Sequence, residues 1–276
     1  MPEGHTLHRL AIEHAELLGG RTVSASSPQG RFAAGAARID GATLTGTDAH
    51  GKHLLHFYAT TGGEPLRLHV HLGLYGKFAQ GAPPAPDPRG ALRLRLATDD
   101  VWLDLRGPTA CDLLTEEQEA ALHARLGADP LRADADPDAA GARIRRSRAP
   151  IAQLLMDQAI VSGVGNVYRA EVLFRHGVDP YLPGRAVDEA LWKTLWSDLV
   201  DLMREGVRTG RIDTVRPEHE PEAMGRPPRV DDHGGEVYVY RRADQGCHVC
   251  GGPIRTAVLA ARNLYWCPGC QPSRSR

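Results

Sequence analysis

Four cysteines near the carboxyl end have the spacing of a metal site. Cys247 and Cys250 form one C-x-x-C pair, and Cys267 and Cys270 form a second pair after sixteen intervening residues. Two such pairs complete the tetrahedral thiolate shell that Zn²⁺ prefers. Because protein ligands then fill every position, no place remains for an activated water. The spacing predicts one structural zinc ion, and free or disulfide-bonded cysteines are the alternative.

The second residue could supply a nucleophile. Removal of Met1 would leave the ring nitrogen of Pro2 as a secondary amine, and an α-amino group has a reference pKa near 7.7–8.0, against about 10.4 for lysine. Such an amine can attack an anomeric carbon of a sugar to form an iminium, which acidifies the neighbouring carbon and permits elimination. The adjacent Glu3 could donate a proton. A proline at this position is also common where it has no such role.

Lysine is rare in this chain, which draws attention to Lys52 at the start of a predicted strand. Only three of the 33 basic residues are lysines. A titratable amine can donate a proton where an always-charged guanidinium cannot, although an ordinary lysine at a strand end is the alternative. Histidines at 53, 56, 69 and 71 alternate along predicted strands. They have no carboxylate at a matching spacing, so we expect no second metal site.

Glycines mark a corner between two helical runs. The segment 154–174 reads LLMDQAIVSGVGNVYRAEVLF, with Gly163 and Gly165 directly before Asn166. Glycine permits close backbone approach, and the first amides of a helix have no partners within it. This corner could bind a phosphate, although a plain helical hairpin explains the same residues.

The hydrophobic pattern predicts an α+β fold with three domains, at residues 1–128, 129–232 and 233–276. A short helix over 6–18 precedes alternating segments up to about residue 105, which predict an antiparallel β-sandwich with a hairpin loop at 81–90. After a polar stretch at 128–144 the pattern becomes helical over 151–161, 167–176 and 187–206. A proline-rich connection at 210–235 leads to the cysteines.

Composition limits the class of protein. The 276 residues carry 33 basic and 34 acidic side chains, and 42% are hydrophobic. A net charge of −1 excludes a uniformly basic nucleic-acid binder, but from Arg241 onward six arginines stand against the single acid Asp244. We find no apolar signal-peptide core and no stretch of about 18 apolar residues. We therefore expect a soluble, cytoplasmic protein with no membrane partner.

Four motifs, in order and in register, resemble the formamidopyrimidine-DNA glycosylase and endonuclease VIII family of base-excision repair enzymes. They are MPEG (1–4), GKHLL (51–55), MDQAIVSGVGN (156–166) and RNLYWCPGCQ (262–271). The resemblance covers nearly the whole chain. It implies an N-terminal β-sandwich with an N-terminal helix, a helical domain with a helix-two-turn-helix motif, a C-terminal zinc-finger hairpin, and damaged double-stranded DNA bound between them by a monomer.

The resemblance also implies roles for single residues. Pro2 would be the Schiff-base nucleophile, Glu3 would protonate the sugar or leaving group, and Lys52 would serve β-elimination. Arg262 would grip a phosphate and assist δ-elimination. The residues implied to contact DNA are Asn166 at a phosphate, Leu74 and Tyr75 as the wedge that replaces an extruded base, and Arg125.

The start PEG is typical of the endonuclease VIII branch, which favours oxidised pyrimidines as substrates. Thr6 and Gly73 depart from the residues usual in the family at their positions. We therefore expect a bifunctional DNA glycosylase and abasic-site lyase. Two other interpretations stay open, a non-catalytic protein that binds damaged or abasic DNA and a zinc-ribbon nucleic-acid factor, but neither uses Pro2 and Lys52 together.

Overall fold

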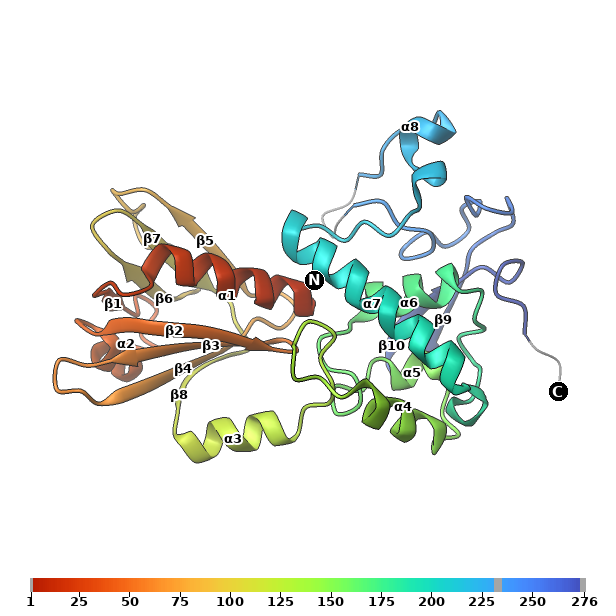
Figure 1. The fold of residues 1–276 in the computed structure, drawn as a ribbon. Coiled ribbons are helices and arrows are strands. Elements are labelled where there is room, and N and C mark those ends of the chain that lie inside the picture. The colour runs from red at the N-terminus through yellow and green to blue at the C-terminus, as the bar shows by residue number, and fades with distance from the viewer. Residues whose placement is uncertain (1, 231–234, 274–276) are drawn as a thin grey trace. The chain divides into compact units, whose positions relative to one another are not determined.

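The protein is described by a computed structural model that covers residues 2–230 and 235–273. The chain divides into two compact units, Met1–Arg125 and Leu126–Arg276. Each unit is described by itself (Figure 1). The division into three domains stays a prediction.

The first unit contains two four-stranded antiparallel sheets, in the orders β1-β6-β7-β5 and β2-β3-β4-β8. The strands are β1 (Ser24–Ser26), β2 (Thr43–His50), β3 (His53–Ala59), β4 (Pro65–His71), β5 (Lys77–Gly81), β6 (Leu92–Ala97), β7 (Trp102–Arg106) and β8 (Ala110–Leu114). Leu54 and Leu68 of one sheet share a buried core with Leu94 and Leu103 of the other. The predicted β-sandwich is therefore confirmed.

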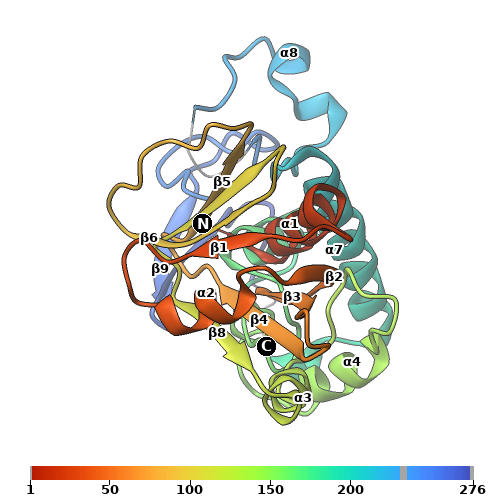
Figure 2. The ribbon, with the colours of Figure 1, turned by 90° about the vertical axis from the view of Figure 1, so that its left-hand side faces the viewer.

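Helix α1 (Gly4–Leu18) lies along β2 and β3, as Figure 1 and Figure 2 both show. Its apolar positions recur at helical spacing, and Leu7, Ala11 and Leu18 are buried against the sandwich. Two further helices, α2 (Ala33–Ile39) and α3 (Glu116–Ala124), complete the unit. Thr115 begins α3 with a capping box to Gln118, which stabilises this short helix.

A chain of polar side chains crosses the core beneath α1. His14 Nδ1 lies 3.0 Å from His56 Nε2, and His56 Nδ1 lies 3.0 Å from the hydroxyl of Tyr58. All three side chains are buried. Burial lowers the pKa of His56 to about 4 and that of His14 well below its usual value. These imidazoles are therefore neutral in the folded protein.

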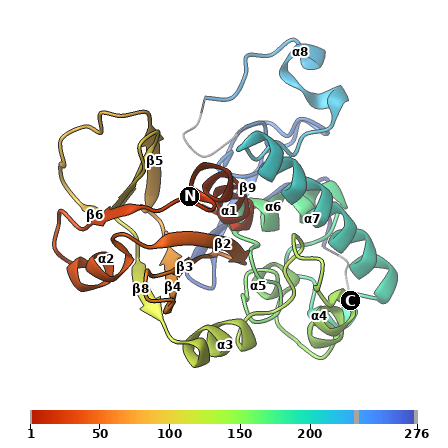
Figure 3. The same ribbon diagram turned by 60° about the vertical axis from the view of Figure 1, so that its left-hand side comes forward.

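The second unit is mainly helical and ends in a two-stranded hairpin. Its elements are α4 (Pro137–Arg145), α5 (Ile151–Leu154), α6 (Asn166–Arg175), η1 (Gly184–Ala186), α7 (Glu189–Thr209), η2 (Pro217–His219), α8 (Pro221–Met224), β9 (Arg255–Leu259) and β10 (Arg262–Trp266). Helices α6 and α7 run side by side (Figure 1 and Figure 3). Trp192 of α7 is buried and donates from Nε1 to the carbonyl of Pro137.

Three segments differ from the sequence-based expectation. The segment 81–90 is not a hairpin loop, because the strands that it connects, β5 and β6, each pair with β7 and not with each other. The predicted helix over 151–161 ends at Leu154, and irregular backbone follows up to Gly165. Within it the side chain of Gln158 donates to the carbonyl of Val164 and accepts from the amide of Gly163. The polar stretch at 128–144 contains α4, which buries Ile144. The Ala, Asp and Pro residues of this stretch show no helical hydrophobic pattern, but they include a helix N-cap. The side chain of Asp136 accepts from the amide of Ala139.

A fully buried carboxylate joins α6 to the chain that enters the zinc finger. Glu171 accepts from the backbone amides of Tyr238 (2.7 Å), Val239 (2.9 Å) and Tyr240 (2.8 Å). It also accepts from the hydroxyl of Thr214 at 2.7 Å. Four donors thus converge on one helical side chain, which fixes residues 238–240 against α6.

Replacing this carboxylate should destabilise the second unit strongly. In Glu171→Ala three buried amides lose their acceptor, so we expect the free energy of unfolding to fall by about 3–5 kcal/mol. Urea unfolding followed by hydrogen exchange in α6 would measure the change. Glu222→Ala, on the exposed surface of α8, is the matched control and should differ from the parent by about 0.5 kcal/mol or less. Equal effects of the two variants would contradict this account.

Candidate functional site

The four predicted zinc ligands converge. Their Sγ atoms all lie within 4.8 Å of one another, with Cys247 3.8 Å from Cys270 and Cys250 3.4 Å from Cys267. Four sulfurs placed about 2.3 Å from one ion in a tetrahedron are about 3.8 Å apart. The donor set therefore fits one structural zinc ion.

The zinc knuckle is fixed to the helical part of the second unit. The side chain of Gln271, itself buried, accepts from the amide of Cys267 at 3.0 Å and donates to the carbonyl of Val178 at 2.9 Å. Local sequence patterns do not predict this contact, because Gln271 and Val178 are 93 residues apart in the chain. A zinc ion held by the four cysteines would therefore fix the hairpin β9–β10 beside the segment that follows α6.

The hairpin brings Arg262 next to the glycine-rich corner. Asn166, the first residue of α6, donates from Nδ2 to the carbonyl of Asn263 at 2.9 Å. Asn263 directly follows Arg262, which is exposed at the start of β10. The two turn residues before Arg262, Ala260 and Ala261, both have left-handed backbone angles, as a two-residue hairpin turn requires. An exposed guanidinium and a helix N-terminus therefore share one corner, and both attract phosphate.

Sequence reasoning missed the residue that orders this corner. Arg169 is 1% exposed, and its Nη2 donates to Asn166 Oδ1 and, at 3.1 Å, to the carbonyl of Asn263. Arg169 follows Asn166 by three positions, so the two side chains share a helix face. That spacing was the available signal. The guanidinium holds the Asn166 amide in one orientation and adds positive charge beneath the corner.

In the first unit, Pro2 and Glu3 directly precede α1, and the direction of α1 places them at the end of the unit that contains the Lys52 turn. The carboxyl end of α1 lies near Leu44, because Gly20 donates to the Leu44 carbonyl, and the Thr47 hydroxyl donates to the carbonyl of Ala11.

The contact between Ala11 and Thr47 is about equally far from the start of α1 and from the end of β2. Gly4 is about 10 Å from Ala11 along the helix, and His50 is about 10 Å from Thr47 along β2. The helix start and the β2–β3 turn are therefore at the same end of the unit (Figure 1). Glu3 is fully buried there, and Lys52 is half-buried.

A second turn follows β4 beside the Lys52 turn. His71 Nδ1 donates to the carbonyl of Lys52 at 2.9 Å, and the chain then turns through Leu74 and Tyr75. These side chains are 51% and 85% exposed, so the tip of the turn presents two large side chains to solvent. Gly73 has a φ of +67°, and a Cβ there would lie 1.9 Å from the hydroxyl of Thr109. The turn therefore has no room for a side chain at this position.

Arg125 follows α3 and is exposed. Its charge lowers the pKa values of His53 and His69, so it lies near both. The first unit thus holds Pro2, Glu3, Lys52, Leu74, Tyr75 and Arg125, whereas the second unit holds Asn166, Arg262 and the four cysteines.

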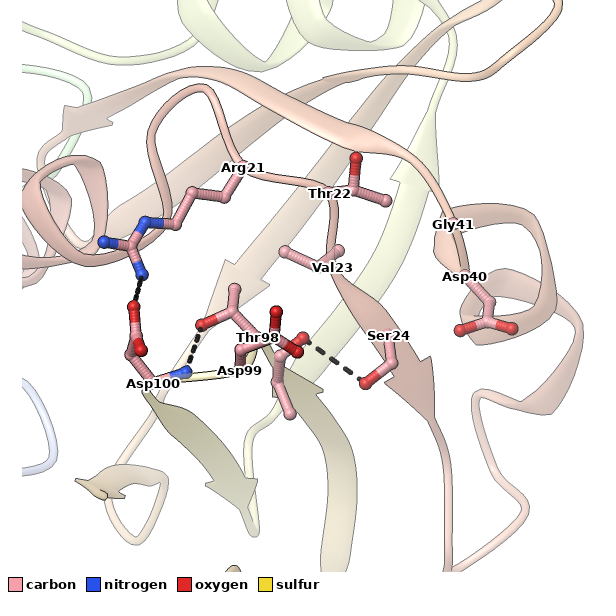
Figure 4. A pocket seen from close by; sticks show the side chains of 10 residues that line it. Arg21, Thr22, Val23, Ser24, Asp40, Gly41, Thr98, Asp99 and Asp100 are labelled. Carbon is pink, nitrogen blue, oxygen red and sulfur yellow. Dashed lines mark hydrogen bonds and ion pairs between the residues drawn. The ribbon is translucent and has the colours of Figure 1, made fainter. Parts of the chain in front are cut away.

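A cavity of about 640 Å³ in the first unit contains none of the predicted site residues. Asp40, Asp99 and Asp100 line it together with a single cation, Arg21, which pairs with Asp100 at 2.7 Å (Figure 4). Its excess of negative charge repels phosphate. We therefore place no nucleic-acid contact there.

Family models match three parts of the chain. They are the formamidopyrimidine-DNA glycosylase N-terminal domain over residues 1–111, the formamidopyrimidine-DNA glycosylase H2TH domain over residues 126–217, and a zinc finger found in FPG and IleRS over residues 245–272. The chain is also 51% identical over 275 residues to Endonuclease 8 1 of Mycobacterium tuberculosis (strain ATCC 25618 / H37Rv), covering 98% of this chain and 100% of that protein.

The chain belongs to the formamidopyrimidine-DNA glycosylase and endonuclease VIII family. More distant family members include Endonuclease 8 2 of Mycobacterium bovis, 31% identical over 276 residues and covering 98% of this chain and 100% of that protein. Formamidopyrimidine-DNA glycosylase of a Synechococcus strain is 30% identical over 230 residues, or 80% of this chain and 79% of that protein. The predicted family, its zinc finger and its class of DNA repair glycosylases are thereby confirmed.

Solved structures of the family share the fold. Lactococcus lactis Fpg in complex with DNA containing N7-benzyl-Fapy-dG matches with a TM-score of 0.77 at 21% identity, covering 99% of this chain and 100% of that chain. The same protein bound non-covalently to DNA containing an abasic site matches equally well, over 98% of this chain and 100% of that chain. Damaged DNA is therefore the partner of these structural relatives.

Within the ranges 2–230 and 235–273, no helix combines the length and the apolar character that crossing a membrane requires.

Proposed function

We propose that this protein is a bifunctional DNA glycosylase and abasic-site lyase that removes oxidised pyrimidines from double-stranded DNA as a monomer. The observation that carries the proposal is the joint placement of Pro2 and Glu3 at the start of α1, at the same end of the unit as Lys52. An amine nucleophile, a buried carboxyl and a second amine are the groups that this chemistry needs.

In the first chemical step the amine of Pro2 replaces the damaged base at C1′ of the sugar. The unprotonated nitrogen of Pro2, after removal of Met1, attacks C1′ of the damaged nucleotide, and the bond from C1′ to the base breaks. Glu3 supplies a proton to either the sugar ring oxygen or the departing base, and the proton that the Pro2 nitrogen loses goes to the other of these two leaving groups. Loss of the ring oxygen from C1′ then gives a cationic iminium that links protein and deoxyribose.

Elimination follows from the acidity that the iminium confers. A proton acceptor removes a proton from C2′, and the electron pair of that C–H bond expels the phosphate from C3′. This step is β-elimination. A second elimination expels the phosphate from C5′, and water releases the sugar fragment and restores the amine of Pro2. We assign Lys52 to proton transfer in the first elimination. Arg262 stabilises the charge of the departing phosphate in the second elimination.

Contacts to DNA hold the substrate in place. Asn166 and Arg262 would bind a phosphate beside the lesion, and Arg125 would bind the backbone at the first unit. Extruding the damaged base costs a few kcal/mol of stacking, and the exposed side chains of Leu74 and Tyr75 would fill the space that it leaves. The PEG start and the 51% identity to an endonuclease 8 support pyrimidine lesions as substrates.

Trapping with borohydride tests the proposal. Protein that mass spectrometry shows to begin at Pro2 is incubated with a duplex containing one abasic site and sodium borohydride, which reduces an iminium to a stable amine. We expect a covalent protein–DNA adduct and, without borohydride, strand cleavage. Protein that retains Met1 is the matched control, because its Pro2 nitrogen is an amide and should give no adduct.

Binding of the duplex without an adduct from mature protein would refute the lyase chemistry. It would instead support the alternative function, a non-catalytic protein that binds damaged or abasic DNA.

A further inference from the structure

A cavity of about 370 Å³ in the second unit has four arginines in its lining, Arg226, Arg229, Arg241 and Arg242. Glu236 is the only carboxylate among the described residues that line it. We call this feature the arginine cavity. Its walls come from the segment after α8 and from the segment that leads into the zinc finger. None of the residues assigned to the lyase chemistry or to DNA contact lines it, so the proposed function leaves the cavity unexplained.

Hydrogen bonds hold the two walls of the cavity together. Arg229 donates from Nη1 to the carbonyl of Gly235 and from Nη2 to that of Tyr240, each at 3.2 Å. The amide of Arg229 also donates to Glu236 Oε1 at 2.5 Å. Arg226 pairs with the other carboxylate oxygen of Glu236 at 2.7 Å. The cavity is therefore fixed by the fold, because two of its arginines connect one wall to the other.

Arg242 brings a buried positive charge to the cavity, since this residue is 6% exposed. Its guanidinium donates to the carbonyl of Tyr238, to the carbonyl of Gly246 at 2.7 Å, and to Gln245 Oε1 at 3.2 Å. These three acceptors are neutral groups. They satisfy donors of the guanidinium but do not neutralise its charge, and a buried charge favours a nearby charge of opposite sign.

The cations around the cavity repel one another. Burial lowers the pKa of Arg242, and the neighbouring Arg226 and Arg229 lower it further. Glu171 and Cys247 raise this pKa but offset these effects only in part. The charged guanidinium is therefore less favourable here than in water, and an anion in the cavity would reduce that cost.

The lining of the cavity is positive and includes a donor that has no acceptor. Its four arginines and one glutamate leave an excess of three positive charges. Asp231 and Asp232 lie outside the described residues, and the excess would stay positive even if both faced the cavity. The Nε atom of Arg226 is buried and makes no hydrogen bond within the part of the chain that the structure describes. Buried donors normally have an acceptor, so both observations favour an anion that accepts hydrogen bonds.

We propose that the arginine cavity is a binding site for a phosphate group, carried either by a free nucleotide or by a DNA strand. Guanidinium groups bind phosphate oxygens through charge-assisted hydrogen bonds, and they stay charged throughout the physiological pH range. The inference does not rest on the lyase chemistry, because no residue assigned to that chemistry lines the cavity.

Calorimetry with a nucleotide tests the site. The full-length, zinc-loaded protein is titrated with thymidine monophosphate at constant ionic strength, and thymidine, which lacks the phosphate, is the control ligand. We expect the monophosphate to bind at least about tenfold more tightly than thymidine, because the phosphate makes the charge-assisted hydrogen bonds.

Two substitutions with opposite expected effects locate the phosphate. Arg226→Gln removes a cation and a donor, so we expect the affinity for thymidine monophosphate to fall about tenfold. Glu236→Gln removes the negative charge but keeps an acceptor for the Arg229 amide, so we expect that affinity to rise about threefold. Because a folding defect does not raise affinity, Glu236→Gln decides the matter if Arg226→Gln fails to fold. Arg208→Gln, which changes an exposed arginine that pairs with Glu205 on α7, is the matched control and should bind as the wild type does.

A short duplex without a lesion distinguishes the two sources of the phosphate. If Arg226→Gln weakens duplex binding and Glu236→Gln strengthens it, a DNA strand carries the phosphate. If duplex binding is unchanged and only the affinity for thymidine monophosphate responds, a free nucleotide carries it. Unchanged affinities for both ligands in the folded variants would overturn the inference. That result would leave the proposed function intact, because borohydride trapping measures the lyase chemistry separately.

Discussion

Removing the zinc ion should abolish DNA binding while the first unit remains folded. The ion would connect four cysteines within a hairpin that contributes few buried apolar residues, among them Ile254 and Leu264. Structural zinc supplies about 10–16 kcal/mol of folding free energy to such modules. Without it the hairpin should unfold, and Arg262 would lose its place beside Asn166.

Hydrogen exchange during chelation would test this result. Amides of β9 and β10 should lose protection as zinc leaves. Helix α6 should lose part of its protection, because Glu171 joins it to residues 238–240 and Gln271 bonds Val178 just after its end. The strands of the first unit should stay protected. Cys267→Ser should reproduce the effect, whereas Cys111→Ala, which changes a buried cysteine outside the zinc site, should keep zinc and DNA binding. Simultaneous loss of protection in both units would contradict the prediction.

Mild acid should destabilise the first unit. His5, His14, His56 and His69 are all buried in it. Burial lowers the pKa of His5 to about 3, those of His56 and His69 to about 4, and that of His14 well below its usual value. In the unfolded chain each would titrate near 6.5.

The sign follows from where the protons bind. Between pH 6.5 and about 4 the unfolded chain binds protons that the folded unit excludes, so stability is complete above pH 6.5 and is lost as the pH falls toward the folded values. An imidazole with a folded pKa of about 4 lowers the free energy of unfolding by about 2 kcal/mol at pH 5. Four such groups together should remove on the order of 8 kcal/mol, which is comparable to the whole stability of a small domain.

Urea unfolding at pH 7.5 and pH 5, with hydrogen exchange read at the amides of β3 and β4, measures this loss. The double variant His14→Gln, His56→Gln should be less stable than the parent at pH 7.5 yet lose less stability on acidification. His219→Gln should leave the pH dependence of the first unit unchanged. A first unit with the same stability at both pH values would contradict the assignment of neutral buried imidazoles.

The amino-acid sequence by itself determined the features that depend on local spacing. The two C-x-x-C pairs predicted the zinc site, alternation along 92–97 and 66–71 predicted strands, and helical periodicity predicted α1, α6 and α7 within a few residues. Local spacing is sufficient there because the ligands or apolar groups involved are neighbours in the chain. The family motifs also lie within such short segments.

Only the tertiary structure decided which distant residues meet. Arg169 reaches the carbonyl of Asn263 across 94 positions, and Glu171 reaches the amides of residues 238–240 across nearly 70. The contacts among His50, His53 and His71 likewise depend on strand register, since a shift of one residue would turn a strand histidine to the opposite side of the sheet. These contacts depend on how whole helices and strands pack against one another. Local residue patterns do not predict that packing, because the partners are far apart in the chain.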